Sequence, residues 1–277
     1  MSHPFRDQEV RRDVLICAGL DPSGGAGLIA DVRVVTELGC RPVGVITATT
    51  VQNTTGVIAV ESMVADQVRE QLEFLLSDIE VRAVKIGMVG SSEVARAIAE
   101  ALALTGAPVV WDPVMHPSRG DVPFVDSLFS RALAPLMQHV TLLTPNAPEL
   151  AVLTGARAPF TSVAEATAAG VALAARLDTA VLVKGGHLAG GDGDRTDEAV
   201  DVLCQAPGGG GGVELLRGAR LRDGEHVHGT GCALSSAIAA HLARGADLVD
   251  ACREAKAFVA ARIAAPARPG RGAAAIV

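Results

Sequence analysis

Six short apolar runs recur along the chain, separated by stretches with the spacing of amphipathic helices. The runs are Val14–Ala18, Val43–Ala48, Val84–Gly87, Val109–Asp112, Val140–Thr144 and Ala180–Lys184. Most of them lack alternating polar positions, which is typical of strands covered on both faces. Strands that alternate with helices predict a parallel sheet with helices on both faces and right-handed crossovers. The predicted fold class is therefore α/β with a mostly parallel central sheet.

Helical spacing is clearest in two places. Ser92 is the predicted N-cap of a helix whose apolar face holds four residues: Val94, Ile98, Ala101 and Leu102. Near the C-terminus, Leu234, Ile238 and Leu242 share one helix face and Gly245 is expected to end that helix. A second C-terminal helix is predicted from about Asp247 to Ile263.

The remaining segments predict a hairpin and two loose ends. The runs Glu198–Cys204 and Val213–Leu221 flank a Pro followed by five glycines at 207–212, which indicates a β-hairpin. Residues 1–12 and 266–277 are expected to fray. Because no internal repeat or linker is present, residues 1–277 are predicted to form a single domain.

Composition and charge exclude several classes of function. The net charge is −7, and the chain has no Tyr, one Trp and six Phe. An acidic chain that is poor in aromatic residues is a poor candidate for nucleic-acid binding. No apolar run approaches the roughly 18 residues that span a bilayer. The five cysteines contain no C-x-x-C pair, which favours reduced thiols and a cytoplasmic protein over a zinc site or a disulfide framework.

Ligands of open parallel sheets bind beyond the carboxyl ends of the strands, so the predicted strand exits are the places to search. After the first strand, Ser23 is followed by Gly24–Gly27 and then by a predicted helix start. Small residues there allow the backbone to approach a ligand, although a tight turn is the alternative interpretation. At the next exit, the amides of Gln52 and Asn53 suit the edge of a heterocycle or, alternatively, turn hydrogen bonds.

Carboxylates mark two further exits. Asp112 ends an apolar strand, where it can bind Mg²⁺ or cap the loop. Asn146 and Glu149 are three residues apart at a predicted helix start, so both oxygens can face one ligand. The same spacing also fits a capping box, which the residues alone favour.

Two last segments suit phosphate binding. Lys184 precedes two glycines and can meet a phosphate as a point charge, with a surface lysine as the alternative. Gly229, Thr230 and Gly231 open the helix that carries Cys232, so their N–H groups and the helix dipole form an anion site. A thiol at a helix N-terminus is expected to have a lowered pKa. We therefore prefer a functional Cys232, acting as a base or stabilising a phosphoryl group, to a buried apolar cysteine.

These segments together resemble the ribokinase superfamily, and within it the hydroxymethylpyrimidine/phosphomethylpyrimidine kinases of thiamine biosynthesis. They occur in the order of that family and span residues 14 to about 260. The matching segments are Ala18–Asp31, Val45–Ala48, Gln52–Thr54, Lys85–Met88, Asp112–Met115, Thr144–Glu149, Val183–His187 and His228–Cys232. Cys232 is the most specific of these matches, because most ribokinase relatives have Asp at that position.

The resemblance implies a ribokinase-like fold and phosphorylation of 4-amino-5-hydroxymethyl-2-methylpyrimidine and its monophosphate, with ATP and Mg²⁺. It further implies that Asp31 and Gln52 hydrogen-bond the pyrimidine and that Met88 and Val114 line its pocket. Residues implied for the nucleotide side are Lys184 at the ATP phosphates, Asn146, Glu149 and Asp112 around Mg²⁺ and water, and Gly229, Thr230, Gly231 and Cys232 at the anion site. A homodimer is implied as well.

Some positions depart from the family pattern. Residues that are usual in the family are replaced at three places, namely Leu28–Ile29, His226–Val227 and His116–Gly120. Because of the replacement at His116–Gly120, the family's lysine contact after Met115 cannot be carried over. The glycine loop and the tail, which lacks the usual Gly-Pro ending, also differ.

Four alternatives stay open. The alternative within kinases is a pyridoxal or pyridoxine kinase of the Cys-bearing type. A Rossmann oxidoreductase would need a G-x-G-x-x-G spacing that the first loop lacks. A thiol hydrolase using Cys232 and His228 would need an oriented third group. A non-catalytic ligand-binding relative is the fourth, and the retained Lys184, Glu149 and Cys232 argue against it.

Overall fold

The computed structural model describes residues 12–115, 134–186, 188, 197–221 and 224–276. In these residues the strands form one nine-stranded sheet in the order β3-β2-β1-β4-β5-β6-β7-β8-β9. The strands are β1 (Asp13–Leu20), β2 (Arg41–Asn53), β3 (Gly56–Ser62), β4 (Ala83–Ile86), β5 (Val109–Trp111), β6 (Leu142–Leu143), β7 (Ala180–Val183), β8 (Glu198–Gln205) and β9 (Gly212–Ala219).

The six central strands are parallel, from β2 through β1, β4, β5 and β6 to β7. Strand β3 is antiparallel at one edge, and the β8–β9 hairpin is antiparallel at the other. The predictions of an α/β fold, of strands at the six apolar runs and of the hairpin are therefore confirmed. Burial of β2 is weaker than predicted, because only Val45, Thr47 and Ala48 of this strand are buried. Strand β3 was not predicted, because the polar Thr54–Gly56 segment between β2 and β3 resembles a ligand loop more than a turn between strands.

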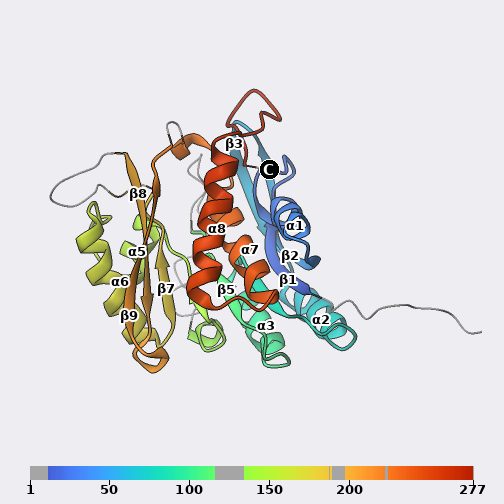
Figure 1. Cartoon of the computed structure of the whole chain (residues 1–277). Helices are drawn as coiled ribbons and strands as arrows, with labels where there is room; N and C mark the ends of the chain where they lie inside the picture. Colours follow the sequence, from blue (N-terminus) through green and yellow to red (C-terminus); the bar gives the residue numbers. More distant parts are fainter. Residues whose placement is uncertain (1–11, 116–133, 187, 189–196, 222–223, 277) are drawn as a thin grey trace, which may run out of the picture.

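Helices cover both faces of this sheet (Figure 1). One face is covered by α1 (Gly27–Glu37), α7 (Thr230–Ala243) and α8 (Leu248–Ile263), whose buried residues form one apolar cluster with the sheet. The other face is covered by α2 (Ala65–Leu76), α3 (Ser92–Leu102), α5 (Ala147–Thr154) and α6 (Val163–Leu177). In the part of the chain that the structure describes, no helix has the length and apolar character required to cross a membrane.

The predicted helix ends are close to the observed ones. Ser91, and not Ser92, caps α3, because Ser91 has extended backbone and its side chain accepts a hydrogen bond from Val94 N–H. Both C-terminal helices are confirmed: Gly245 adopts the left-handed conformation just after α7, and Asp247 caps α8.

The C-terminal tail does not fray, contrary to the prediction. Ala267 and Ala275 form an antiparallel bridge, and Ala273 N–H donates to Thr54 O at 2.8 Å. His228 pairs with the same segment, since its N–H donates to Ala274 O at 2.8 Å and its carbonyl accepts from Ile276 N–H at 3.1 Å. Backbone hydrogen bonds fix this segment, and a Gly/Ala/Arg composition does not reveal them. The predicted fraying of residues 1–11 lies outside the described residues.

Candidate active site

A cavity of about 1480 Å³ opens at the carboxyl ends of the parallel strands. A single small ligand usually occupies about 300–1,000 Å³, so this cavity has room for two. Its wall combines segments far apart in sequence, including Gly19–Asp21, Gln52, Met88, Asp112, Lys184 and Gly229–Cys232. The strand exits chosen from the sequence therefore converge on one space.

Three charged groups meet on one wall of the cavity. Lys184 Nζ lies 2.6 Å from Asp112 Oδ1 and 3.5 Å from Glu149 Oε2. Burial alone would lower the pKa of Lys184, but the two carboxylates raise it above its ordinary value. Burial raises the pKa of Glu149 to about 7, with Asp112 adding to the increase and Lys184 opposing it. A fixed cation therefore sits between two carboxylates at the place where a phosphate group can enter.

Glu149 serves two purposes. It completes a capping box with Asn146: Asn146 N–H donates to Glu149 Oε2 at 2.7 Å, and Glu149 N–H donates to Asn146 Oδ1 at 2.8 Å. The capping box favoured by the sequence is confirmed. It holds the Glu149 carboxylate beside Lys184, so capping and a ligand role are compatible.

Asp112 and Glu149 fit a magnesium ion that takes most of its coordinating oxygens from phosphate groups and water rather than from the protein. Within the described ranges, no group of three or more His, Cys, Asp or Glu side chains is placed to hold a metal ion alone. Mg²⁺ at nucleotide sites usually takes one or two carboxylates and completes its shell with phosphates and water. Asp112 and Glu149, both within reach of Lys184, supply such a pair.

The start of α7 has a backbone geometry that is compatible with the predicted anion site. Gly229 is the N-cap with φ 87°, and the first N–H groups of a helix have no acceptor inside it. A Cβ on Gly229 would lie 2.0 Å from Gly25 O, and one on Gly231 would lie 3.2 Å from Lys184 Nζ and 3.3 Å from Asp112 Oδ2. Glycine at 229 therefore lets the chain pass close to the backbone of Gly25, and glycine at 231 lets the helix start approach Lys184 and Asp112.

Cys232 lies at this helix start, but its thiol is not acidic. Burial raises the pKa of Cys232 to about 11; Lys85 opposes the increase, while Asp31 and Asp112 add to it. The predicted lowering of this pKa is therefore wrong, because loss of hydration on burial is the largest influence and raises it. At neutral pH the side chain is a thiol, which can donate a hydrogen bond but is a poor base.

This assignment predicts how Cys232 reacts with alkylating reagents. Only the thiolate reacts, so in the folded protein the iodoacetamide rate should rise about tenfold per pH unit from pH 7 to 10. In the denatured protein the same rise should level off near pH 9, where an ordinary thiol is largely ionised. Mass spectrometry of the peptide that carries Cys232 measures both rates. A folded-state rate that is flat above pH 7 would show a lowered pKa instead.

Asp31 does not line the cavity, contrary to the predicted contact with the heterocycle. Asp31 belongs to the buried face of α1, and its side chain is fully buried: Oδ2 accepts from Lys85 Nζ at 2.5 Å and Oδ1 accepts from Ser236 Oγ at 2.8 Å. Burial would lower the pKa of Lys85, but Asp31, with Cys232 and Asp112, raises it. Lys85 thus holds a fixed positive charge beneath the anion site, a role that sequence reasoning missed.

Another part of the cavity lining is apolar and includes the side-chain amide of Gln52. Met88 packs with Ala48, Val57 and Val114 in a small cluster that borders the cavity. Gly19 makes room for it, since a Cβ there would lie 2.2 Å from the end of the Met88 side chain. Gln52 also lines the cavity, so the predicted substrate residues Gln52, Met88 and Val114 share one region.

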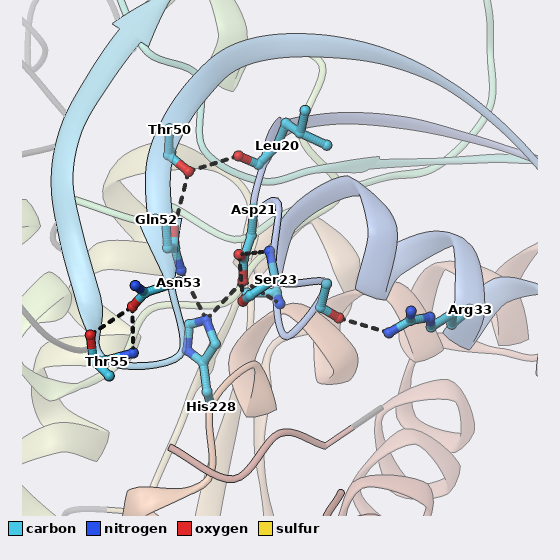
Figure 2. Close-up of polar contacts among 11 residues, drawn as sticks. Leu20, Asp21, Ser23, Arg33, Thr50, Gln52, Asn53, Thr55 and His228 are labelled. Atoms are coloured by element: carbon cyan, nitrogen blue, oxygen red, sulfur yellow. Dashed lines mark hydrogen bonds and ion pairs between the residues drawn. The ribbon is translucent and has the colours of Figure 1, made fainter. Parts of the chain in front are cut away.

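Two further polar residues, Asp21 and His228, lie in this region (Figure 2). The sequence did not indicate Asp21, and it indicated His228 only for the thiol-hydrolase alternative. His228 Nε2 lies 3.2 Å from Asp21 Oδ2 and 3.2 Å from Gln52 Nε2. Both residues lie in segments that were selected from the sequence, but the functional interpretation of those segments rested on the glycines within them and on Cys232. The substituted segment His116–Gly120 lies outside the described residues.

The β8–β9 hairpin and α8 close the far side of the cavity, which the sequence did not predict. Arg217 and Arg220 of this region line the space. Asp201 accepts from Gly185 N–H at 2.7 Å and from Lys256 Nζ at 2.8 Å, which anchors the chain immediately after Lys184.

Comparison with known proteins agrees with this geometry. The sequence profile of the family described as Phosphomethylpyrimidine kinase matches residues 21–276. A hydroxymethylpyrimidine/phosphomethylpyrimidine kinase of Streptomyces coelicolor is 41% identical over 253 residues, which cover 91% of this chain and 88% of that protein. The crystal structure of a phosphomethylpyrimidine kinase from Clostridium difficile is 34% identical, with a TM-score of 0.73, over 91% of this chain and 99% of that one.

A pyridoxal kinase shares the fold at greater distance. The structure of the Staphylococcus aureus pyridoxal kinase in complex with AMP-PCP and pyridoxal is 27% identical to this chain. Its TM-score is 0.80, and the match covers 96% of this chain and 92% of that one.

Proposed function

The chain belongs to the phosphomethylpyrimidine kinase family, and on that premise we propose that it phosphorylates 4-amino-5-hydroxymethyl-2-methylpyrimidine and then its monophosphate, with ATP as donor. It is a phosphotransferase of thiamine biosynthesis. A thiamine biosynthesis multifunctional protein of Corynebacterium efficiens is 40% identical over 233 residues, which cover 84% of this chain and 30% of that protein. The observation that carries the proposal is that one cavity is lined both by an apolar cluster with Met88 and Val114 and by the charged Lys184, with Gln52 and the start of α7 in the same lining.

The apolar wall suits the heterocycle. Met88 and Val114 offer a flat apolar surface to an aromatic ring, and Gln52 offers an amide to its polar edge. The hydroxymethyl group of the substrate would then point towards Cys232 and the start of α7.

The cationic wall suits the triphosphate. Lys184 would meet the ATP phosphates, and the N–H groups at Gly229, Thr230 and Gly231 would hold the transferring group. The substrate hydroxyl oxygen forms the new P–O bond, the bond from the γ-phosphorus to ADP breaks, and the hydroxyl proton is released. Because positioning and charge stabilisation dominate such transfers, a Cys232 thiol that donates a hydrogen bond fits this step without ionising.

Magnesium would be organised by Asp112 and Glu149, with Asn146 fixing Glu149. When bound there, Mg²⁺ would neutralise phosphate charge. We extend the proposal to a cytoplasmic homodimer that binds neither nucleic acid nor membrane, in keeping with the acidic, aromatic-poor composition.

A pyridoxal kinase is the second candidate, because the Staphylococcus aureus enzyme that shares this fold was solved with pyridoxal. Pyridoxal and hydroxymethylpyrimidine both present a hydroxymethyl group on an aromatic ring. The higher identity to phosphomethylpyrimidine kinases favours the pyrimidine.

Parallel ADP-release assays on the two alcohols, with and without Mg²⁺, test this proposal. We expect kcat/KM for hydroxymethylpyrimidine to exceed that for pyridoxal by at least about tenfold, and EDTA to abolish turnover. Faster phosphorylation of pyridoxal would establish the second candidate. Ligand binding without ADP release would indicate a non-catalytic relative.

A further inference from the structure

Three side chains from distant segments meet at the heterocycle end of the cavity (Figure 2). Asp21 follows β1, Gln52 lies near the end of β2 and His228 precedes α7. The His228 ring lies between the other two, with Nε2 3.2 Å from Asp21 Oδ2 and 3.2 Å from Gln52 Nε2. His228 therefore connects a buried carboxylate to the amide proposed to bind the heterocycle.

The protonation of Asp21 determines that of the ring. Asp21 accepts hydrogen bonds from Ser23 N–H at 2.8 Å, Ser23 Oγ at 2.7 Å and Ala26 N–H at 3.0 Å. Although burial opposes it, the hydrogen bonds from His228 and Ser23 lower the pKa of Asp21 below its ordinary value. An ionised carboxylate only accepts hydrogen bonds, so His228 must carry a proton on Nε2.

A proton on Nε2 in turn selects the orientation of the Gln52 amide. An N–H that faces the Gln52 NH₂ would place two donors 3.2 Å apart, whereas the amide oxygen can share the single Nε2–H with Asp21 Oδ2 in a three-centre hydrogen bond. The hydrogen bond of the Thr50 hydroxyl favours the same orientation of the Gln52 amide. The single proton of this hydroxyl goes to Leu20 O at 2.8 Å, so the Gln52 group 3.2 Å from Thr50 Oγ1 must be a donor. Half a turn of the carboxamide about its last bond satisfies both neighbours.

We propose that His228, oriented by Asp21, is a positioning residue that fixes Gln52 with its oxygen towards His228 and its NH₂ towards Thr50. The Gln52 amide then presents one carbonyl lone pair and one N–H to the cavity, and the acceptor and the donor have fixed positions relative to each other. This order lets Gln52 distinguish a ring nitrogen beside an exocyclic amine, as in an aminopyrimidine, from rings without that pair. The inference deepens the proposed function and rests on it.

The backbone of His228 is held firmly enough for this role. The C-terminal segment bonds to it on both sides, through Ala274 O and Ile276 N–H. Gly25 lies against the ring, since a Cβ at that position would come within 2.8 Å of His228 Cδ2. The ring therefore has a defined place between Asp21 and Gln52.

The test compares two substitutions at position 228. His228→Leu removes the donor, whereas His228→Gln keeps an N–H donor close to the Nε2 position. We expect His228→Leu to raise KM for hydroxymethylpyrimidine about tenfold and to leave KM for ATP within about twofold. The loss should be absent for the analogue without the 4-amino group, and His228→Gln should restore KM to within about threefold of wild type. Thermal melts report whether each variant folds.

A double-mutant cycle then asks whether His228 acts through Gln52. In a Gln52→Leu background, His228→Leu should cause no further rise in KM for the pyrimidine. Asp21→Asn leaves only one acceptor oxygen and adds an NH₂ donor, so it weakens the bond that orients the ring and should weaken discrimination against the deamino analogue. This variant keeps the test decisive if His228→Leu does not fold. Equal losses for both heterocycles, or additive effects with Gln52→Leu, would overturn the inference alone. Wild-type enzyme that does not phosphorylate the pyrimidine would overturn the proposed function, and this inference with it.

Discussion

Replacement of Cys232 with alanine is expected to lower kcat about 100- to 1,000-fold while KM for ATP stays within about threefold. The thiol lies at the start of α7, in the cavity and close to the charges of Lys85, Asp31 and Asp112. Its contribution is expected in the transition state, where charge on the transferring group is greatest. A loss of kcat without a loss of nucleotide binding is the signature of such an interaction.

Two further variants make this prediction specific. Cys232→Ser keeps a hydrogen-bond donor and should retain part of the activity. Cys40→Ala removes a buried thiol that donates to Ala240 O outside the cavity, and should leave kcat within about twofold. Steady-state kinetics on the three proteins decides the matter, and an unchanged kcat in Cys232→Ala would remove this residue from catalysis.

The second large effect is on stability. Lys85 and Asp31 form an ion pair in which neither side chain is exposed. Lys85→Met would leave the Asp31 carboxylate buried without its cation, which costs about 3–5 kcal/mol of unfolding free energy for such pairs. Urea denaturation measures this loss from the shift in midpoint at constant slope.

The neutral double variant is the matched control. Asp31→Asn/Lys85→Met carries no buried charge and keeps an acceptor for Ser236 Oγ, so it should recover more than half of the lost stability. A cost below about 1 kcal/mol for Lys85→Met alone would contradict the buried ion pair.

Strand positions were predictable because hydrophobic burial follows sequence locally. Runs such as Val14–Ala18 are apolar at every position, and the structure buries them on both faces. Strand β3 lacks that signal because it is an edge strand with several exposed positions, among them Ile58. Its pairing with β2 depends on a turn whose residues also suit a ligand loop.

The errors at the site have a different cause, namely interactions between residues far apart in sequence. Asp31 and Lys85 are 54 positions apart, so nothing local shows that the predicted substrate contact is the partner of a buried lysine. The Cys232 pKa depends on burial created by other elements, which a helix position alone does not reveal. The C-terminal segment is ordered by backbone bonds to Thr54 and His228, which composition cannot show.

The direct test of the account is mass spectrometry of one reaction that contains the full-length protein, ATP, Mg²⁺ and hydroxymethylpyrimidine. The account predicts that the monophosphate appears first and is then converted to the diphosphate, with one ADP formed for each phosphoryl group transferred. Cys232→Ala, tested in parallel at the same protein concentration, should form both products much more slowly. No phosphorylated pyrimidine in the wild-type reaction, with the protein folded and ATP intact, would contradict it.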